Sequence, residues 1–108
     1  MDRTTTIEEI KNNIATFVRE RDWGKFHSPK NLSMSIAIEA SELMEIFQWL
    51  SIDKSWEINN TKESTHLKEE LSDVMIYCIS LANQLDIDIS KAIEDKIRKN
   101  ALKYPVNK

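Results

Sequence analysis

Two pairs of acidic residues recur at the same spacing in two separate segments of the chain. Glu39 and Glu42 stand three positions apart, and so do Glu70 and Asp73. Residues three apart on an α-helix project from the same side, one turn above the other. If the two helices pack side by side, four carboxylates converge, and their mutual repulsion requires a compensating cation. The pattern therefore indicates a divalent metal site.

The ligand type indicates which metal and which substrate such a site would take. Mg²⁺ prefers oxygen ligands and is commonly completed by substrate phosphates, so we predict Mg²⁺ as cofactor, with Mn²⁺ as a substitute. A bound ion of this kind neutralises phosphate oxygens and activates water. Helices also carry acids on solvated faces, and spacing alone leaves that alternative open. Glu45 and Glu69 extend the acidic stripe and fit a solvated or outer position better than direct ligation.

A basic cluster lies near the C-terminal end of the chain. Basic groups across a cleft from a metal would suit phosphate binding. A basic last turn is also what any helix C-terminus prefers, and that alternative stays open. The residues concerned are Lys91, Lys96, Arg98, Lys99 and Lys103, accompanied by Asn100 and Tyr104.

The elements that must position these residues are read from the apolar spacing. Apolar residues recur at helical intervals in about 6–21, 32–50, 65–85 and 90–103, which predicts four helices. The connections are short, so neighbouring helices should run antiparallel and form a bundle. The polar stretch 51–64 has room for a short helical turn.

Local signals mark where two of these helices begin. Thr5 with Glu8, or Thr6 with Glu9, offers a capping box for the first helix. Ser90 is a good N-cap for the fourth.

Length and composition limit the class of protein. The 108 residues suit a single domain, 1–108, and the scarcity of glycine (one) and proline (two) favours an all-α fold. A net charge of -3 gives no general footprint for a nucleic acid polymer. One cysteine, no signal sequence and no long apolar run predict a cytoplasmic protein without a membrane partner. So small a core leaves apolar area exposed, which predicts self-association.

Four blocks of sequence, taken in order, resemble the MazG-like group of all-α nucleotide pyrophosphohydrolases, and most closely its dCTP pyrophosphatase branch. The resemblance covers nearly the whole chain. The acid pattern Glu39-x-x-Glu42 followed by Glu70-x-x-Asp73 carries it, together with the segments 20–32, 47–49, 69–77 and 96–105.

The resemblance implies a fold, an activity and an assembly. The fold would be a four-helix MazG-like bundle, and Glu39, Glu42, Glu70 and Asp73 would bind Mg²⁺ and form the catalytic group. The reaction would be hydrolysis of a dNTP, dCTP or a modified dNTP, to the monophosphate and pyrophosphate, which cleanses the nucleotide pool. Each site would be built at a subunit interface of a homo-oligomer, a dimer or a tetramer. As a working hypothesis, Glu42 takes the proton from the attacking water.

The resemblance also implies which residues bind the substrate. Trp23 and Trp49 would line the base and sugar pocket, with Tyr77 near the sugar or phosphates. Lys96 and Asn100 would contact the triphosphate or the nucleoside. A flat indole is a good surface for stacking a base. Without the resemblance, packing in the core explains the three aromatic residues equally well.

One position departs from the branch. A histidine in its first helix helps form the base pocket, and the counterpart here is Ile14, which has no hydrogen-bonding group. This departure puts strict selectivity for cytosine in doubt. His27 lies in the connector, residues 22–31 between the first two helices, and we expect it to form a hydrogen bond that orders the loop in preference to contacting the base.

Two rival functions remain. Di-iron carboxylate bundles carry two Glu-x-x-His motifs on facing helices, whereas this chain has one, Glu63 to His66. A non-catalytic helical module that acts as a regulatory partner needs only exposed apolar faces, and a fold can outlive its activity. Metal analysis and nucleotide binding separate these rivals from the hydrolase.

Overall fold

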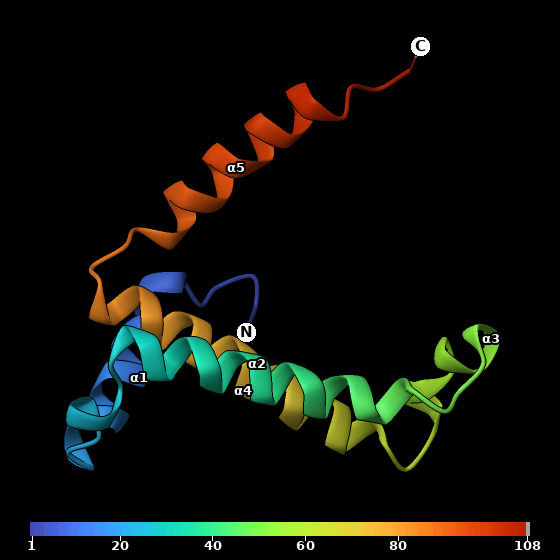
Figure 1. Cartoon of the computed structure of the whole chain (residues 1–108), viewed down its shortest axis with the longest axis horizontal. Helices are drawn as coiled ribbons and strands as arrows, with labels where there is room; N and C mark the ends of the chain where they lie inside the picture. The colour runs from blue at the N-terminus through green and yellow to red at the C-terminus, as the bar shows by residue number, and fades with distance from the viewer. Residues whose placement is uncertain (108) are drawn as a thin grey trace.

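A computed structural model describes residues 1–107, and within that range the chain forms helices and no strand. The four long helices predicted from the apolar spacing are confirmed, each with bounds within three residues of the prediction. In that same range, no helix combines the length and the apolar character needed to cross a membrane. The elements in order are α1 (Ile7–Glu20), the 3₁₀ turn η1 (Gly24–Phe26), α2 (Pro29–Phe47), α3 (Ile52–Ser55), the 3₁₀ turn η2 (Ile58–Asn60), α4 (Ser64–Gln84) and α5 (Ile89–Lys103) (Figure 1).

Side-chain caps fix the beginnings of α1, α2 and α5, whereas α4 begins without a side-chain cap. The Thr6 hydroxyl accepts a hydrogen bond from the backbone N–H of Glu9 at 3.1 Å, so the second of the two candidate caps is the one used. Ser28 caps α2, and Pro29 follows at the first helical position, where its missing N–H costs nothing. The prediction of Ser90 as N-cap of the last helix is wrong. Asp88 has the extended backbone that a cap needs, and α5 begins directly after it.

The centre of the molecule is the antiparallel pair α2 and α4 (Figure 1). Helix α1 packs against α4. Few apolar side chains are fully buried, and they come from α2, η2 and α4: Leu32, Ile58, Ile79 and Ala82. Because α2 and α4 lie side by side along their length, residues on their facing surfaces are held at fixed positions. This pair is the frame on which the acidic residues are mounted.

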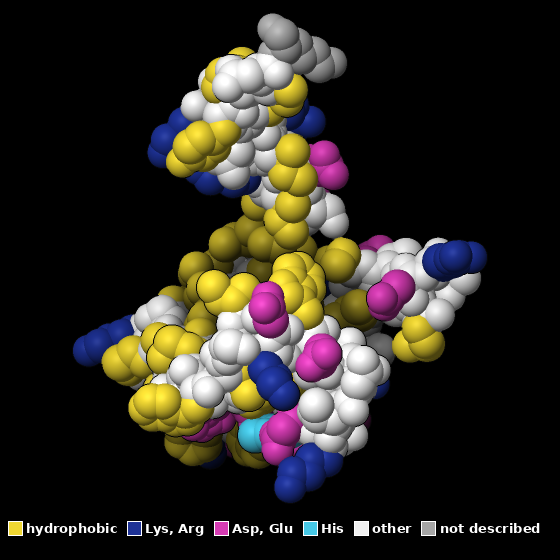
Figure 2. Space-filling model, turned by 90° about the vertical axis from the view of Figure 1, so that its right-hand side faces the viewer, with side chains coloured by type: hydrophobic (Ala, Val, Ile, Leu, Met, Phe, Trp, Pro, Cys, Tyr) yellow, Lys and Arg dark blue, Asp and Glu magenta, His cyan; other side chains and the backbone are white. Residues whose placement is uncertain are grey.

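Helix α5 stands apart from that frame. It projects away from α2 and α4, and in the space-filling view it is a separate column above the body (Figures 1 and 2). Its apolar side chains stay open to solvent, with Ile93 50%, Ile97 55% and Leu102 85% exposed. The radius of gyration is 16.6 Å, whereas a compact chain of this length has about 13 Å. The helix predicted to complete the bundle is present, but within one chain it does not pack as a fourth neighbour.

Local interactions explain how α5 stays helical without packing. The Asp88 carboxylate accepts from the backbone N–H of Lys91 at 3.0 Å. One turn on, Asp95 forms ion pairs with Lys91 (2.7 Å) and Arg98 at helical spacing. These contributions are individually small, a few tenths of a kcal/mol for such a pair, or about 1 kcal/mol for a cap. They hold the helix and leave its apolar side free.

Candidate functional site

The four predicted acids converge. Glu39 and Glu42 come from α2, and Glu70 and Asp73 come from α4. One carboxylate oxygen from each of Glu39, Glu70 and Asp73 lies within 4.8 Å of the other two. Glu42 is within hydrogen-bonding reach of both Glu39 and Glu70 when a proton is shared. The packing of α2 against α4 therefore gathers both pairs into one cluster, which we call the acid cluster.

The electrostatics of the acid cluster are unfavourable without a cation. Burial raises the pKa of Glu39 to about 7, with further contributions from the shared proton and charge of Glu42 and the charges of Asp73 and Glu70. Burial, followed by Glu42, also raises the pKa of Glu70. One oxygen on each of Glu39 and Glu70 is buried and has no hydrogen-bond partner. Oxygens in such positions fit the ligand set of a hard divalent ion.

His66 stands beside the acid cluster on α4. Its Nδ1 lies 3.0 Å from a Glu63 oxygen and its Nε2 lies 3.4 Å from a Glu70 oxygen. The hydrogen bond to Glu63 is the main cause of the raised pKa of His66. The candidate ligand group within residues 1–107 consists of carboxylates and does not include this histidine. The Glu63 to His66 motif therefore flanks the site and orients Glu70.

An apolar cavity of about 420 Å³ opens next to the acid cluster, between α1, the connector and α4. Asp73 belongs to both, as one wall of the cavity and one member of the acid cluster. We call this space the aromatic pocket. Its lining consists of Asn13, Ile14, Phe17, Val18, Trp23, His27, Asp73, Ile76, Tyr77 and Ser80.

The rings of the aromatic pocket form a continuous row. The centroids of Phe17 and Trp23 are 5.5 Å apart, those of Trp23 and His27 are 6.3 Å apart, and those of His27 and Tyr77 are 6.2 Å apart. The first and last pairs meet edge to face and the Trp23–His27 pair is tilted, and rings at these separations attract one another. The row therefore joins α1, the connector and α4 into one wall.

A left-handed residue sets the course of the connector. Asp22 has φ 53°, a conformation that aspartate tolerates better than most residues. It ends α1 and lets the N–H of Trp23 return to the carbonyl of Val18 at 3.0 Å. Further on, the Asn31 side chain donates to the carbonyl of Phe26 at 3.1 Å and fixes the connector to the start of α2. The sequence of this segment thus directs Trp23 back onto Phe17.

The structure does not show the loop-ordering hydrogen bond that was expected of the His27 Nδ1 atom. Its Nδ1 is buried and makes no hydrogen bond, so the expected loop-ordering bond is not formed by that atom. The ring instead stands between Trp23 and Tyr77. His27 is therefore part of the pocket wall.

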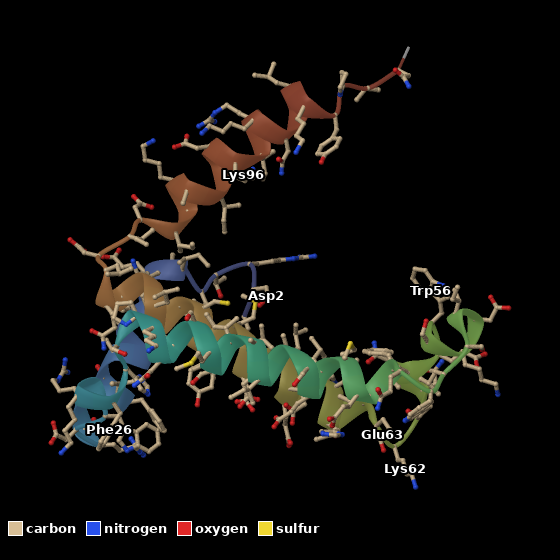
Figure 3. All side chains as sticks on the ribbon, viewed as in Figure 1. Asp2, Phe26, Trp56, Lys62, Glu63 and Lys96 are labelled. Carbon is tan, nitrogen blue, oxygen red and sulfur yellow. The ribbon has the colours of Figure 1, made fainter. Side chains whose placement is uncertain are left out.

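Three of the predicted substrate-binding residues do not line the aromatic pocket of their own chain. Trp49 follows the end of α2 and is 88% exposed. Trp23 precedes the start of the same helix, whose 19 residues span about 28 Å. Lys96 and Asn100 lie on the projecting α5, where Figure 3 labels Lys96. One chain thus unites the four acids with Trp23 and Tyr77, whereas Trp49, Lys96 and Asn100 stand outside the aromatic pocket.

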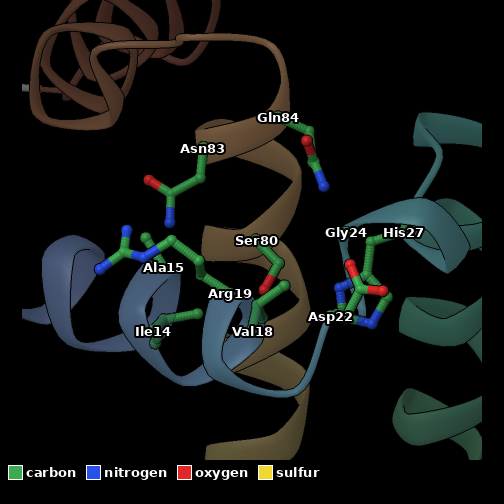
Figure 4. A pocket seen from close by; sticks show the side chains of 10 residues that line it. All are labelled: Ile14, Ala15, Val18, Arg19, Asp22, Gly24, His27, Ser80, Asn83 and Gln84. Carbon is green, nitrogen blue, oxygen red and sulfur yellow. The ribbon is translucent and has the colours of Figure 1, made fainter.

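The sequence reasoning missed Ser80. Its side chain is 3% exposed, and it lines the aromatic pocket as well as a second cavity of about 350 Å³ (Figure 4). The signal for it was available. Asp73, Tyr77 and Ser80 stand at intervals of four and three, which puts them on one face of a helix. A polar residue on that face, among apolar neighbours, is a candidate for the lining of the site.

Known proteins similar to this chain are found both by sequence and by structure. The chain is similar to dCTP pyrophosphatase 1 of Rattus norvegicus, at 41% identity over 106 residues, and to that of Homo sapiens, at 38% identity over 106 residues. In both cases the match covers 94% of this chain and 61% of the relative, so the chain spans about three-fifths of the length of these curated proteins. The crystal structure of a pyrophosphatase from Archaeoglobus fulgidus is 40% identical and superimposes with a TM-score of 0.85 over 92% of both chains. Residues 34–108 match the MazG-like family, and the chain belongs to that family.

Proposed function

We propose that this protein is a Mg²⁺-dependent nucleoside triphosphate pyrophosphohydrolase that converts a dNTP and water to the dNMP and pyrophosphate. The observation that carries the proposal is the acid cluster, four carboxylates on two packed helices with an aromatic pocket at one side. A phosphate-binding metal site beside an apolar pocket fits a nucleotide, which is charged at one end and aromatic at the other. The names of the similar proteins support the same class of reaction.

The cofactor would be held by Glu39, Glu42, Glu70 and Asp73. The buried oxygens of Glu39 and Glu70 that lack partners supply a reason for a cation to bind there. When bound, Mg²⁺, or Mn²⁺ in its place, would neutralise phosphate oxygens and lower the pKa of a coordinated water. Among the chain's own groups, Glu42 remains the candidate that accepts the proton from the attacking water.

The aromatic pocket would receive the nucleoside. Cavities of roughly 300 to 1,000 Å³ with apolar and aromatic walls are typical of small-molecule sites, and the pocket of about 420 Å³ falls in that range. Trp23 offers a ring 42% exposed, available for stacking. Tyr77 lies one turn beyond Asp73 and so stands between the phosphate end and the base end. The row of rings would cover one side of the bound nucleoside.

A second copy of the chain would complete the site. Ile93, Ile97, Lys96 and Asn100 share one side of α5, because their spacings of three, four and seven follow the helical repeat. Burying the exposed isoleucines against a partner would bring Lys96 and Asn100 into the same interface. We therefore propose a homo-oligomer, a dimer or a tetramer, in which α5 and Trp49 reach a neighbouring site. Such an assembly also removes the apolar side chains of α5 from water, at about 1.5 to 3 kcal/mol for each one fully buried.

The test is the release of pyrophosphate from each dNTP in the presence of Mg²⁺. Glu39→Gln and Asp73→Asn should each lower kcat/KM at least 100-fold, because each removes a charged ligand. Glu45→Gln is the matched control, since Glu45 is an exposed acid on the same helix as Glu39, and it should keep full turnover. Binding of Mn²⁺, followed by its paramagnetic resonance signal, gives a second reading that does not depend on turnover.

The outcomes separate the rival functions. Undiminished turnover in both Glu39→Gln and Asp73→Asn would remove the scheme. A wild-type protein that releases no pyrophosphate and binds neither Mg²⁺ nor a nucleotide would favour the non-catalytic helical module. Release of phosphate and a nucleoside diphosphate would show that water attacks the γ-phosphorus and not the α-phosphorus, and the proposed metal site would still stand.

A further inference from the structure

Two buried polar atoms of the pocket wall lack a partner, and both face the same space. The Oγ atom of Ser80 and the Nδ1 atom of His27 are each buried and make no hydrogen bond. A buried polar group without a partner is costly, and the great majority of such groups in folded proteins are satisfied. A ligand that pairs with them removes that cost.

Ser80 behaves differently from other serines inside the helices of this chain. Ser33, Ser41 and Ser72 are exposed and turn their hydroxyls onto a carbonyl of their own helix at 2.7, 2.6 and 2.6 Å. That local bond is the usual solution for a helical serine. The Ser80 hydroxyl forms no such bond although its side chain is only 3% exposed. Its hydrogen-bonding capacity is therefore open to a ligand.

The position of the pair is shared by two cavities. The aromatic pocket of about 420 Å³ and its neighbour of about 350 Å³ have four lining residues in common: Ile14, Val18, His27 and Ser80. The first two are apolar, so Ser80 and His27 supply the polar groups of the shared wall. Figure 4 shows both side chains in the smaller cavity.

The distance from the acid cluster matches a nucleoside laid along α4. Ser80 follows Asp73 by seven residues, two helical turns, which is about 10 Å along the axis. Tyr77 lies between them on the same face. A nucleotide with its phosphates at Asp73 and its sugar beside Tyr77 would bring its base to Ser80.

We propose that Ser80, with His27, is the base-selecting group of this site, and that its hydroxyl hydrogen-bonds the polar edge of the nucleobase. The inference rests on the proposed function and names the group that decides which dNTP is preferred. A hydroxyl both donates and accepts, so it pairs with amino or carbonyl groups of a base. A site built to hydrogen-bond a ligand discriminates against analogues that lack the group, because its buried atom is then left unpaired.

The experiment compares kcat/KM of the wild-type protein and Ser80→Ala for dCTP, dTTP, dATP and dGTP, and for 2-deoxyribose 5′-triphosphate, which has no base. The preferred dNTP should lose on the order of tenfold in kcat/KM, mainly through a higher KM, as expected for one hydrogen bond. The base-free triphosphate should be turned over equally by both proteins. If the role of Ser80 were purely structural, Ser80→Ala would instead lower kcat/KM for all five substrates by the same factor.

Matched variants keep the test decisive. Ser33→Ala removes a hydroxyl from an exposed site on α2 and should leave the ratios of kcat/KM among the five substrates unchanged. His27→Phe retains a ring between Trp23 and Tyr77 but loses the ring nitrogens. Like Ser80→Ala, it should reduce the ratio of kcat/KM between the preferred dNTP and the other dNTPs. It carries the test if Ser80→Ala does not fold.

The two levels of the proposal fail separately. Wild-type turnover that is lost in Glu39→Gln supports the proposed function, whatever Ser80→Ala does. Unchanged selectivity in both Ser80→Ala and His27→Phe would then overturn the base-selecting role alone. A wild-type protein inactive on all five substrates would overturn the proposed function and this inference with it.

Discussion

At the scale of single residues, Glu39 links stability to pH. Its pKa is about 7 in the folded chain against a usual 4.5, so the folded state holds a proton that the unfolded state releases. The contribution of Glu39 to the free energy of unfolding is fully present below about pH 4.5 and is lost as the pH rises through about 7. Chelator-treated protein should therefore unfold at lower urea at pH 8 than at pH 5.

The variant Glu39→Gln isolates this effect. The raised pKa of His66 acts in the same direction, so the fall in wild-type stability includes its contribution. The fall between pH 5 and pH 8 should be smaller in Glu39→Gln, and Mg²⁺ should stabilise the wild-type protein more at pH 8 than at pH 5. Metal-free protein that becomes more stable with rising pH would contradict the prediction.

Trp23 provides a second prediction at this scale. Its ring borders the aromatic pocket, and stacking of a base on such a ring contributes about 1 to 3 kcal/mol. Trp23→Ala should therefore raise KM for the preferred dNTP by about tenfold or more, with a smaller change in kcat. Trp56→Ala is the matched control, because Trp56 is 85% exposed and lies beside α3, at the far end of the molecule from Phe26 (Figure 3). Equal effects of the two substitutions would exclude a specific role for Trp23.

At the scale of elements, the start of α2 determines how well the acid cluster is held. The Ser28 hydroxyl accepts from the N–H of Asn31 at 3.1 Å and caps the helix that carries Glu39 and Glu42. Ser28→Ala should lower the free energy of unfolding by about 1 kcal/mol, measured by urea denaturation. Ser33→Ala in the same helix removes an exposed hydroxyl and improves helix propensity, so it should be neutral or slightly stabilising. Reversal of that order would mean that the cap does not limit the stability of α2.

At the scale of the whole molecule, the exposed side of α5 determines assembly. Ile97→Glu puts a charge on that side, and sedimentation velocity should show a lighter species than the wild-type oligomer, with turnover reduced because Lys96 and Asn100 no longer reach a site. Circular dichroism should change little, since α5 stands apart from the rest of the single chain (Figure 1). Lys99→Gln changes the net charge equally on the opposite side of the helix and should leave the mass unchanged. A wild-type protein that sediments as a monomer would remove the proposed interface.

Much of the frame could be predicted because it depends on local rules. The spacing of apolar residues gives the period of a helix, so four helices were located within three residues, although the cap of the last one was assigned to Ser90 in place of Asp88. The spacing of Glu39 to Glu42 and of Glu70 to Asp73 determined which acids share a face on each helix. Whether the two faces meet depends on how α2 packs on α4, and the structure brings them together.

Other features depend on contacts between segments far apart in the chain. Ser80 and His27 become unpaired polar atoms only when α1, the connector and α4 enclose them, because burial is a property of the surroundings and not of the residue. Likewise, Trp49, Lys96 and Asn100 carry the family pattern in sequence, yet the length of α2 and the course of α5 keep them out of the aromatic pocket of their own chain. The sequence by itself determined the helices and the chemistry mounted on each. The tertiary structure decided which of those groups meet, because only packing sets the distance between helices.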